Sequence, residues 1–459
     1  MKKNKNMKTI VCPARQIHVR RVLCIAPMLF AMLLASCTSQ QEPPQSLTYG
    51  ADVSDAFYVE RLPLIDSAFQ RYVDLGVMPH AVTMVVHNGR VVHNKAFGWR
   101  DREKNIPCET SDIFRIASQS KAVSVVAFMT LFEEGLFQLD EPIKKYIPEF
   151  ANPQVLESYD AKTGSYTVRP AVRDITIRHL ITHTSGICYD GVFDLLLRQH
   201  GVAGHNTLDS LTLAENVKRI ARVPLKHDPG EAFTYSYNID VLGYLAEILT
   251  GKDFYIVVKE RVLDPCDMHE TWFHVPADKA ERVVTLYSYR KNAGDAEAST
   301  LPHGTTYYGD ARGSLVRSDN ELFQTFPYAG AGTFCSPSAG LCGTIEDYAK
   351  FCQMIINGGT FNNHRVIGRK TLEMMQKNGV GNMRGEIGFG MAWDVFTPEN
   401  AHNTIVSEGS MRWGGMFGTD YIIDPKENLI VLMYVNNMPN LSGYNPKTLM
   451  HNVTYQALR

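Results

Sequence analysis

The segment IASQSK, residues 116–121, places two hydroxyls and one amine within four positions, just ahead of a long apolar run. A serine hydroxyl is a poor nucleophile at neutral pH and needs a neighbouring base to accept its proton. If a helix begins near Ala117, Ser118 and Lys121 lie three residues apart on one face, where their side chains can meet. Ser118 would also lie at the helix N-terminus, where free N–H groups and the helix dipole favour developing negative charge. We therefore interpret Ser118 as a nucleophile and Lys121 as the group that activates it.

A plain helix start, in which a serine only caps the helix, is the competing interpretation. The pattern Ser-x-x-Lys is weak by itself, because a second copy occurs at Ser288 and Lys291, where a strand-like segment runs into a polar loop. Lysine is also an awkward base, since its ordinary pKa is about 10.4 and half deprotonation at neutral pH costs about 4.6 kcal/mol. Burial and a nearby hydrogen-bonding group can supply that energy, so Lys121 needs a partner, and we expect a tyrosine.

The elements around these residues predict one sheet with an inserted lobe. Residues 81–99 are typical of two strands joined at Asn88-Gly89, and residues 418–436 of a second hairpin that turns between Pro425 and Asn428. Helical spacing follows IASQSK, whereas the middle of the chain alternates helical pieces with polar, glycine-rich loops. Strands near both ends predict a sheet built from the two ends of the chain, with a site in the cleft beside the inserted lobe.

Five blocks of the chain, in order, resemble the serine β-lactamase and penicillin-binding-protein superfamily. The class C-like branch and the family VIII carboxylesterases are most similar in their motifs. The blocks are IFRIASQSKAVSVVAFMTLFEEGLFQLDEPIKKYIPEF, ITIRHLITHTSGI, PGEAFTYSYNIDVLGYLAEILTG, PSAGLCGTIEDYAKFCQMIINGG and WGGMFGTDYIIDPKENLIVLMYV. The resemblance extends from about Phe57 to Arg459 and implies an α+β fold of the β-lactamase/transpeptidase-like type.

On that resemblance we expect an antiparallel sheet flanked by helices and a mainly helical inserted lobe. Residues 55–150 and 329–459 would form the α/β lobe with the sheet and the nucleophile helix, and residues 151–328 the inserted lobe. The segments that we expect as loops shaping the substrate pocket are 155–172, 189–207 and 291–327.

The resemblance also supplies the tyrosine. In YSYNIDVLG, the pattern Tyr-Ser-x-x-x-Asp-Val-Leu-Gly places Tyr235 in the catalytic position, where its phenol would pass a proton between Ser118, Lys121 and the leaving group. Tyr237 is the alternative if the register is shifted by two, and packing at a strand end is the non-catalytic interpretation of Tyr235.

The segment RWGGM, residues 412–416, stands where β-lactamases and DD-peptidases carry Lys-Thr-Gly or His-Thr-Gly on a strand beside the cleft. Gly414 and Gly415 would let a substrate approach the backbone closely. The family pattern implies an oxyanion hole formed by the N–H groups of Ser118 and Met416, and such donors are typically worth about 3–4 kcal/mol each.

Two departures from the family pattern favour an ester over a β-lactam. Trp413 replaces the cationic or histidine residue that helps to hold a β-lactam or peptide carboxylate, and the Tyr-x-Asn motif is altered because Asn238 comes one position late, after Tyr237. The residues expected at the substrate are Trp413, Gly414, Gly415, Tyr237 and Asn238. The first hypothesis is therefore a carboxylesterase that forms an acyl-enzyme. The alternatives are a β-lactamase or D-amino-acid peptidase, and a non-catalytic binding protein on the same scaffold.

No metal or organic cofactor is implied. His179 and His183 have a spacing that can hold zinc, but Leu180 stands where His-Glu-x-x-His needs its Glu, so we expect a structural role. A disulfide between Cys335 and Cys342 is an alternative to free thiols in an exported protein.

The N-terminus predicts export and lipidation. A positively charged lead precedes VLCIAPMLFAMLLA, a run of about fourteen residues, which is shorter than the roughly 20 needed to span a membrane. The ending Leu-Ala-Ser-Cys resembles a bacterial lipoprotein box, which implies removal of residues 1–36 and lipidation of Cys37. A plain secretory signal and an uncleaved anchor are the alternatives. Residues 37–54 suit a tether, and we expect a protein of the bacterial cell envelope.

The composition limits the partners. The 459 residues are 44% hydrophobic with a formal net charge of −2, so the chain can bury a large core and presents no basic surface for nucleic acid. We expect a small-molecule ester, amide or lactam as substrate and contact with a membrane only through the lipid anchor. The sequence sets no oligomeric state.

Overall fold

The computed structural model describes residues 46–291, 313–440 and 442–459. All described residues belong to one compact unit. The predicted leader, Cys37 and the first part of the predicted tether lie outside the described residues. Over the ranges that are described, no helix combines the length and the hydropathy needed to cross a membrane.

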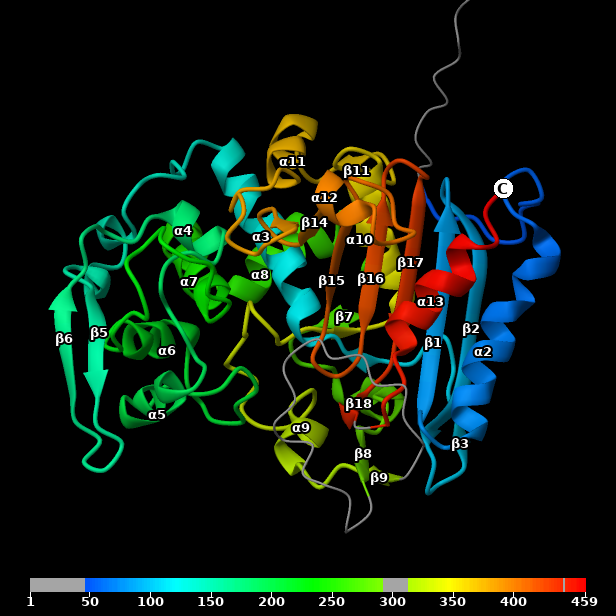
Figure 1. The fold of residues 1–459 in the computed structure, drawn as a ribbon, viewed down its shortest axis with the longest axis horizontal. Helices are drawn as coiled ribbons and strands as arrows, with labels where there is room; N and C mark the ends of the chain where they lie inside the picture. Colours follow the sequence, from blue (N-terminus) through cyan, green and yellow to red (C-terminus); the bar gives the residue numbers. More distant parts are fainter. Residues whose placement is uncertain (1–45, 292–312, 441) are drawn as a thin grey trace, which may run out of the picture. The chain divides into compact units, whose positions relative to one another are not determined.

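A sheet of eight strands, antiparallel at every neighbouring pair, forms the centre of the described unit. In spatial order the strands are β13 (Ile387–Phe389), β14 (Asp394–Phe396), β15 (Met411–Gly414), β16 (Asp420–Asp424), β17 (Leu429–Tyr434), β1 (His80–His87), β2 (Arg90–Asp101) and β3 (Ile106–Pro107). The ladder between β17 and β1 joins the two ends of the chain, with Val82 opposite Tyr434 (Figure 1). The turns predicted at Asn88-Gly89 and at residues 425–428 are confirmed.

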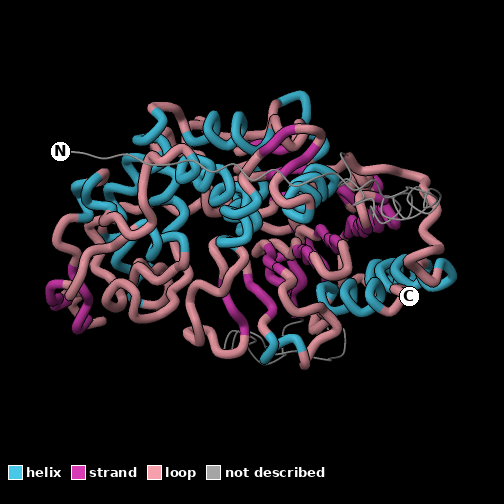
Figure 2. Tube along the Cα trace, turned by 90° about the horizontal axis from the view of Figure 1, so that it is seen from above, coloured by secondary structure: helices cyan, strands magenta, loops and turns pink. Residues whose placement is uncertain are grey.

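Successive side chains of each strand point to opposite faces of the sheet. Both faces carry buried side chains, and helices cover both of them. Val85 and Val431 belong to one buried cluster, and Met84 and Leu432 belong to a second, larger one. The first cluster is covered by α2 (Pro63–Asp74) and α13 (Pro446–Tyr455), the second by α3 (Ser120–Glu133) and α10 (Ile345–Ile356). Figure 2 shows helices on both sides of the strands. The predicted fold class is confirmed.

Between α3 and α10 the regular structure contains more helix than strand. The α-helices of this part are α4 (Ile177–Ile181), α5 (Val192–Gln199), α6 (Leu213–Ile220), α7 (Asn238–Thr250), α8 (Phe254–Val258) and α9 (Glu321–Thr325). It also contains β8 (Tyr287–Lys291) and β9 (Gly313–Arg317), which form a small sheet with β18 (Asn437–Asn440) from the end of the chain. The second Ser-x-x-Lys copy lies on β8, where the Ser288 hydroxyl donates to the carbonyl of Met438. The lobe boundaries given above stay a prediction.

The three segments expected as loops contain regular structure, so that expectation is wrong. Residues 155–172 form most of a hairpin of β5 (Gln154–Tyr159) and β6 (Tyr166–Pro170), and residues 189–207 contain α5. The third segment contains β9 and α9, and its residues 292–312 lie outside the described ranges. The hairpin escaped detection because its strands are largely exposed and carry no clear apolar alternation.

The remaining strands and α-helices of the described part are short. They are β4 (Phe114–Arg115), β7 (Thr271–Trp272), β10 (Cys342–Gly343), β11 (Thr360–Phe361), β12 (His364–Arg365), α11 (Arg369–Met375) and α12 (Pro398–Ala401). Strands β4, β10 and β7, in that spatial order, form a small sheet, and β4 ends directly before residue 116. The six cysteines of the described ranges are free thiols, so the disulfide considered between Cys335 and Cys342 is not formed.

Asp420, at the start of β16, is a buried carboxylate that ties three elements together. Its Oδ1 accepts a hydrogen bond from Nε of Arg412 on β15 at 3.3 Å, and its Oδ2 lies 2.9 Å from Nε2 of His451 on α13. Lys447 Nζ, also on α13, lies 3.9 Å away. Burial by itself would raise the pKa of Asp420, but Arg412, His451 and Lys447 together hold it well below its usual range.

Replacing Asp420 by Asn leaves these cations without their buried counter-charge, so the free energy of unfolding should fall by about 3 to 5 kcal/mol at neutral pH. Because the folded-state pKa is the lower one, this contribution is fully present above the unfolded-state value of about 3.9 and is lost as the pH falls towards the folded-state value. Urea unfolding at neutral and at acid pH measures both effects.

The exposed pair of Asp319 and Arg290, at 2.7 Å, provides the control. Asp319→Asn should change the free energy of unfolding by no more than about 1 kcal/mol, because solvent screens exposed pairs. Equal losses in the two variants would contradict the role given to Asp420.

Candidate active site

The nucleophile turn, residues 116–119, connects β4 to α3. Ala117–Gln119 form a 3-10 turn and α3 begins at Ser120, as the sequence predicted within a few residues. Ala117 has φ of +44°, in the left-handed region that residues with a Cβ rarely adopt. Such a conformation costs of the order of 1–3 kcal/mol and persists only where the surrounding structure imposes it. Ser118 is half-buried although Ile116, Ala117 and Gln119 are buried, so the turn leaves the serine accessible.

Lys121 is brought to Ser118 by the first turn of α3. Its Nζ lies 3.4 Å from Ser118 Oγ and donates a 2.9 Å hydrogen bond to the main-chain oxygen of Ser338. The side chain is 3% exposed, and Nζ lies 4.4 Å from the ring centroid of Tyr235. The lysine is therefore enclosed among neutral partners at the point where it faces the serine.

Tyr235 lies just before α7, between two other rings. Trp413 Nε1 donates a 3.3 Å hydrogen bond to its hydroxyl, and the two ring centroids lie 5.3 Å apart. The ring of His183 packs on Tyr235 with centroids 4.6 Å apart. The structure thus brings together Ser118, Lys121 and Tyr235 with Trp413 at the phenol.

Tyr237 and Asn238 do not join this group. The Tyr237 ring packs on His205, with centroids 4.4 Å apart, and is 8% exposed. Asn238 is fully buried, and its amide Nδ2 donates to Nδ1 of His183 at 2.9 Å while its Oδ1 accepts from the hydroxyl of Ser185. The substrate contact predicted for Asn238 is therefore wrong, because its amide is already satisfied inside the protein.

Gly415, the residue directly after β15, lets the chain pack closely on the nucleophile turn. A Cβ on Gly415 would lie 2.4 Å from the carbonyl oxygen of Ile116 and 2.4 Å from Thr419 Oγ1, both far inside contact distance. The next residue is Met416. The main-chain N–H groups of Ser118 and Met416 donate to no oxygen within the described ranges, so both are free to bind an external acceptor.

Residues 65–451 match the family model described as Beta-lactamase. The chain belongs to the β-lactamase family. Esterase EstB of Burkholderia gladioli is 28% identical over 382 residues, which cover 81% of this chain and 89% of that protein. A putative D-alanyl-D-alanine carboxypeptidase of Escherichia coli (strain K12) is 26% identical over 434 residues, which cover 92% of each chain.

Among solved structures, that of EstCE1, a hydrolase with promiscuous acyltransferase activity, has a TM-score of 0.69 with 24% identity and covers 86% of this chain and 99% of that one. This likeness shows the same fold. β-Lactamase-family proteins are serine hydrolases, so the family and the enzyme class predicted from the sequence are confirmed.

Two groups of this β-lactamase-family site were missed from the sequence. The first is the Ser338 carbonyl that accepts from Lys121. The second is Arg384, whose guanidinium lies 4.7 Å from the ring centroid of Phe233 and 5.8 Å from that of Trp413 and donates to Asp394. A cation therefore lies near Trp413 although position 413 carries none, and its charge is paired with a carboxylate. Ser338 lies within one of the five family-like blocks, but its carbonyl leaves no mark on the residue type, and Arg384 belongs to none of the blocks.

The two histidines considered for zinc have other partners in this β-lactamase-family protein. His179 Nδ1 accepts from the N–H of Thr176 in the cap of α4, and His183 accepts from Asn238. Burial, with the charges of Lys121 and Arg384, holds the pKa of His183 well below its usual range, so this imidazole is neutral. Across the described ranges, no three His, Cys, Asp or Glu side chains form a metal-binding group.

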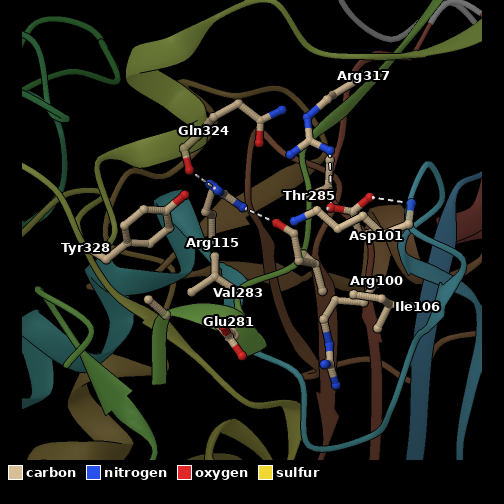
Figure 3. A pocket seen from close by; sticks show the side chains of 13 residues that line it. Arg100, Asp101, Ile106, Arg115, Glu281, Val283, Thr285, Arg317, Gln324 and Tyr328 are labelled. Atoms are coloured by element: carbon tan, nitrogen blue, oxygen red, sulfur yellow. Dashed lines mark hydrogen bonds and ion pairs between the residues drawn. The ribbon is translucent and has the colours of Figure 1, made fainter. Parts of the chain in front are cut away.

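A cavity of about 490 Å³ lies beside β4, and Figure 3 shows the side chains that line it. Arg115 is buried in its wall and donates to the main-chain oxygens of Phe323 and Val284 at 2.7 Å and to that of Gln324. Ser118, Lys121 and Tyr235 do not line it. The cavity is therefore separate from the candidate site, and Arg115 fixes the strand that leads into the nucleophile turn.

A methyl group at position 415 must push β15 away from the nucleophile turn. Gly415→Ala should lower ester hydrolysis about 10- to 100-fold and the free energy of unfolding by about 1–3 kcal/mol. Initial rates and urea unfolding of the full chain measure the two effects. Gly204→Ala is the matched control, because a Cβ at Gly204 meets no atom within 4 Å. A Gly415→Ala enzyme as active as the Gly204→Ala enzyme would contradict the contact.

Proposed function

We propose that this serine hydrolase is a carboxylesterase that works through an acyl-enzyme on Ser118. The observation that carries the proposal is the position of Lys121, whose Nζ lies 3.4 Å from Ser118 Oγ and 4.4 Å from the ring centroid of Tyr235. Lys121 thus contacts both the proposed nucleophile and the proposed proton-transfer group, which supports covalent catalysis by the serine.

In the proposed reaction, Ser118 Oγ attacks the ester carbonyl carbon while its proton passes to the Lys121–Tyr235 pair. The free N–H groups of Ser118 and Met416 donate hydrogen bonds to the oxyanion, at about 3–4 kcal/mol each. The pair then returns the proton to the alkoxide oxygen as the carbon–oxygen bond breaks, which releases the alcohol and leaves the acyl group on Ser118. A water molecule attacks the acyl-enzyme by the same route and frees the acid.

The surroundings of Tyr235 favour a neutral ester over a β-lactam or a D-amino-acid peptide. Trp413 carries no charge and donates its N–H to the phenol oxygen of Tyr235, while Arg384 is paired with Asp394. Neither residue therefore offers an unpaired positive charge to a substrate carboxylate. The partly exposed ring of Phe233, which packs on buried Phe389, adds apolar surface beside them. The peptidase, β-lactamase and non-catalytic alternatives each predict a different result in the assay below.

We further propose that the protein is exported and attached to a membrane of the cell envelope through lipid on Cys37. The motif at residues 34–37 and the polar tether after it support this location. It would present the enzyme to esters outside the cytoplasm.

Ser118→Ala should abolish turnover of short-chain p-nitrophenyl esters, with a loss of about a thousandfold or more, because no other group can form the acyl-enzyme. Labelling by a fluorophosphonate probe should disappear in the same variant. Ser288→Ala, in the second Ser-x-x-Lys copy, is the control and should keep both rate and labelling.

A chromogenic cephalosporin and a D-alanyl-D-alanine peptide complete the substrate panel. Faster turnover of either than of the esters would reject the esterase proposal while keeping the nucleophile. Equal ester rates in wild type and Ser118→Ala would reject the nucleophile itself, and absence of labelling in wild type would favour the binding protein.

Cys37→Ser should move the protein from the membrane fraction to the soluble fraction, because the residue that receives the lipid is gone. Fractionation of cells followed by immunoblotting measures the change. Cys24→Ser, inside the predicted leader, is the control and should stay with the membrane. Membrane attachment of the Cys37 variant would reject lipidation at this position.

A further inference from the structure

Asp240 of α7 is a carboxylate to which the reaction proposed above gives no role. Its side chain is 1% exposed, and a buried charge is costly unless hydrogen bonds and opposite charges compensate it. It lies five residues after Tyr235, in the pattern Tyr-Ser-x-x-x-Asp. The reason for a charge at this position has to be found in its contacts.

Those contacts lead to Lys121 through one loop. Oδ1 of Asp240 accepts from the Ser336 hydroxyl at 2.8 Å and from the main-chain N–H of Ser338 at 3.5 Å. The carbonyl of the same Ser338 accepts the 2.9 Å hydrogen bond from Lys121. The carboxylate therefore holds the residue that receives the lysine, and movement of this loop would shift Lys121 relative to Ser118.

The charge of Asp240 also reaches Lys121. Burial raises the pKa of Asp240, but His205, the contact with Ser338 and Lys121 outweigh it and lower the pKa, so the carboxylate is ionised at neutral pH. Its Oδ2 lies 3.5 Å from Nδ1 of His205, which makes an ion pair when that imidazole is protonated. The carboxylate thus faces His205 on one side and, through Ser338, Lys121 on the other.

Three neighbouring ionisable groups do not replace the negative charge of Asp240. His183 is neutral, because burial, Lys121 and Arg384 lower its pKa. Tyr237 is neutral, because burial and the same carboxylate raise its pKa. Arg384 is paired with Asp394.

We propose that Asp240 is a positioning residue for Lys121 and that its charge sets the pH at which the Lys121–Tyr235 pair becomes a base. The inference rests on the esterase mechanism proposed above. Asp240 acts through two separable routes, which are the hydrogen bonds to the loop of Ser336 and Ser338 and the electrostatic field at the lysine.

The sign of the charge effect follows from electrostatics. A nearby negative charge favours the protonated form of the pair, so the acid limb of the pH–rate profile lies at a higher pH than it would without the carboxylate. Asp240→Asn keeps the size of the side chain and an oxygen for Ser336 but removes the charge. The acid limb should then move to lower pH by about one unit.

The experiment measures kcat/KM for a short-chain p-nitrophenyl ester from acid to alkaline pH, with the full chain purified in mild detergent. Asp240→Asn should lower the plateau about 10- to 100-fold as well as move the limb, because Lys121 is held less firmly. Ser336→Ala removes a hydrogen bond and keeps the charge, so it should lower the plateau with the limb in place. Asp240→Glu restores the charge and should return the limb towards its wild-type position.

Asp347→Asn is the matched control. Asp347 is a buried carboxylate of α10 whose partners are Lys350, Thr271 and the N–H of Glu270. Its neutralisation should lower stability and leave the acid limb unmoved.

Should Asp240→Asn fail to fold, as judged by circular dichroism, His205→Lys gives the same test from a partly exposed position. A permanent cation beside Oδ2 offsets the carboxylate and should also move the limb to lower pH. An unmoved limb in the folded variant, with Ser118 still labelled by the fluorophosphonate, overturns the inference alone. Absence of labelling in wild type overturns the proposed mechanism, and the inference with it.

Discussion

The approach of β15 to the nucleophile turn is so close that no side chain fits between them. A Cβ on Gly415 would come within 2.4 Å of the Ile116 carbonyl, so the strand and the turn form one continuous backbone surface. Ser118 and Met416, whose N–H groups are free, follow Ile116 by two residues and Gly415 by one. The ladder between β17 and β1 holds the approach in place, because it fixes the C-terminal strands against the N-terminal segment that carries the nucleophile.

The charges around the site are arranged in a second layer rather than at the reacting atoms. Lys121 meets a hydroxyl, a carbonyl and an aromatic face, while Asp240 and Arg384 stand one contact further away. In a buried setting of this kind the effective dielectric is low, so each charge is felt more strongly than in water.

Local features were predictable from the sequence because their causes are local. The spacing of Ser118 and Lys121 follows from one helical turn, and Asn88-Gly89 fixes its hairpin through backbone conformation. The Ser338 carbonyl could not be predicted, since 217 residues separate it from Lys121 and a main-chain oxygen leaves no trace in residue type. Asn238 shows how register matters. One position along a helix turns a side chain by about 100°, which is enough to take its amide from the substrate side into the core.

The order of these elements along the chain determines when reactivity can arise during synthesis. Ser118 precedes Met416 by 298 residues (416 minus 118). At about 5–20 residues per second, the ribosome makes the serine roughly 15 to 60 seconds before Met416. Throughout that interval the growing chain lacks the second of the two N–H groups proposed to bind the oxyanion. Under the proposed mechanism, the nascent chain would therefore acylate more slowly than the finished protein.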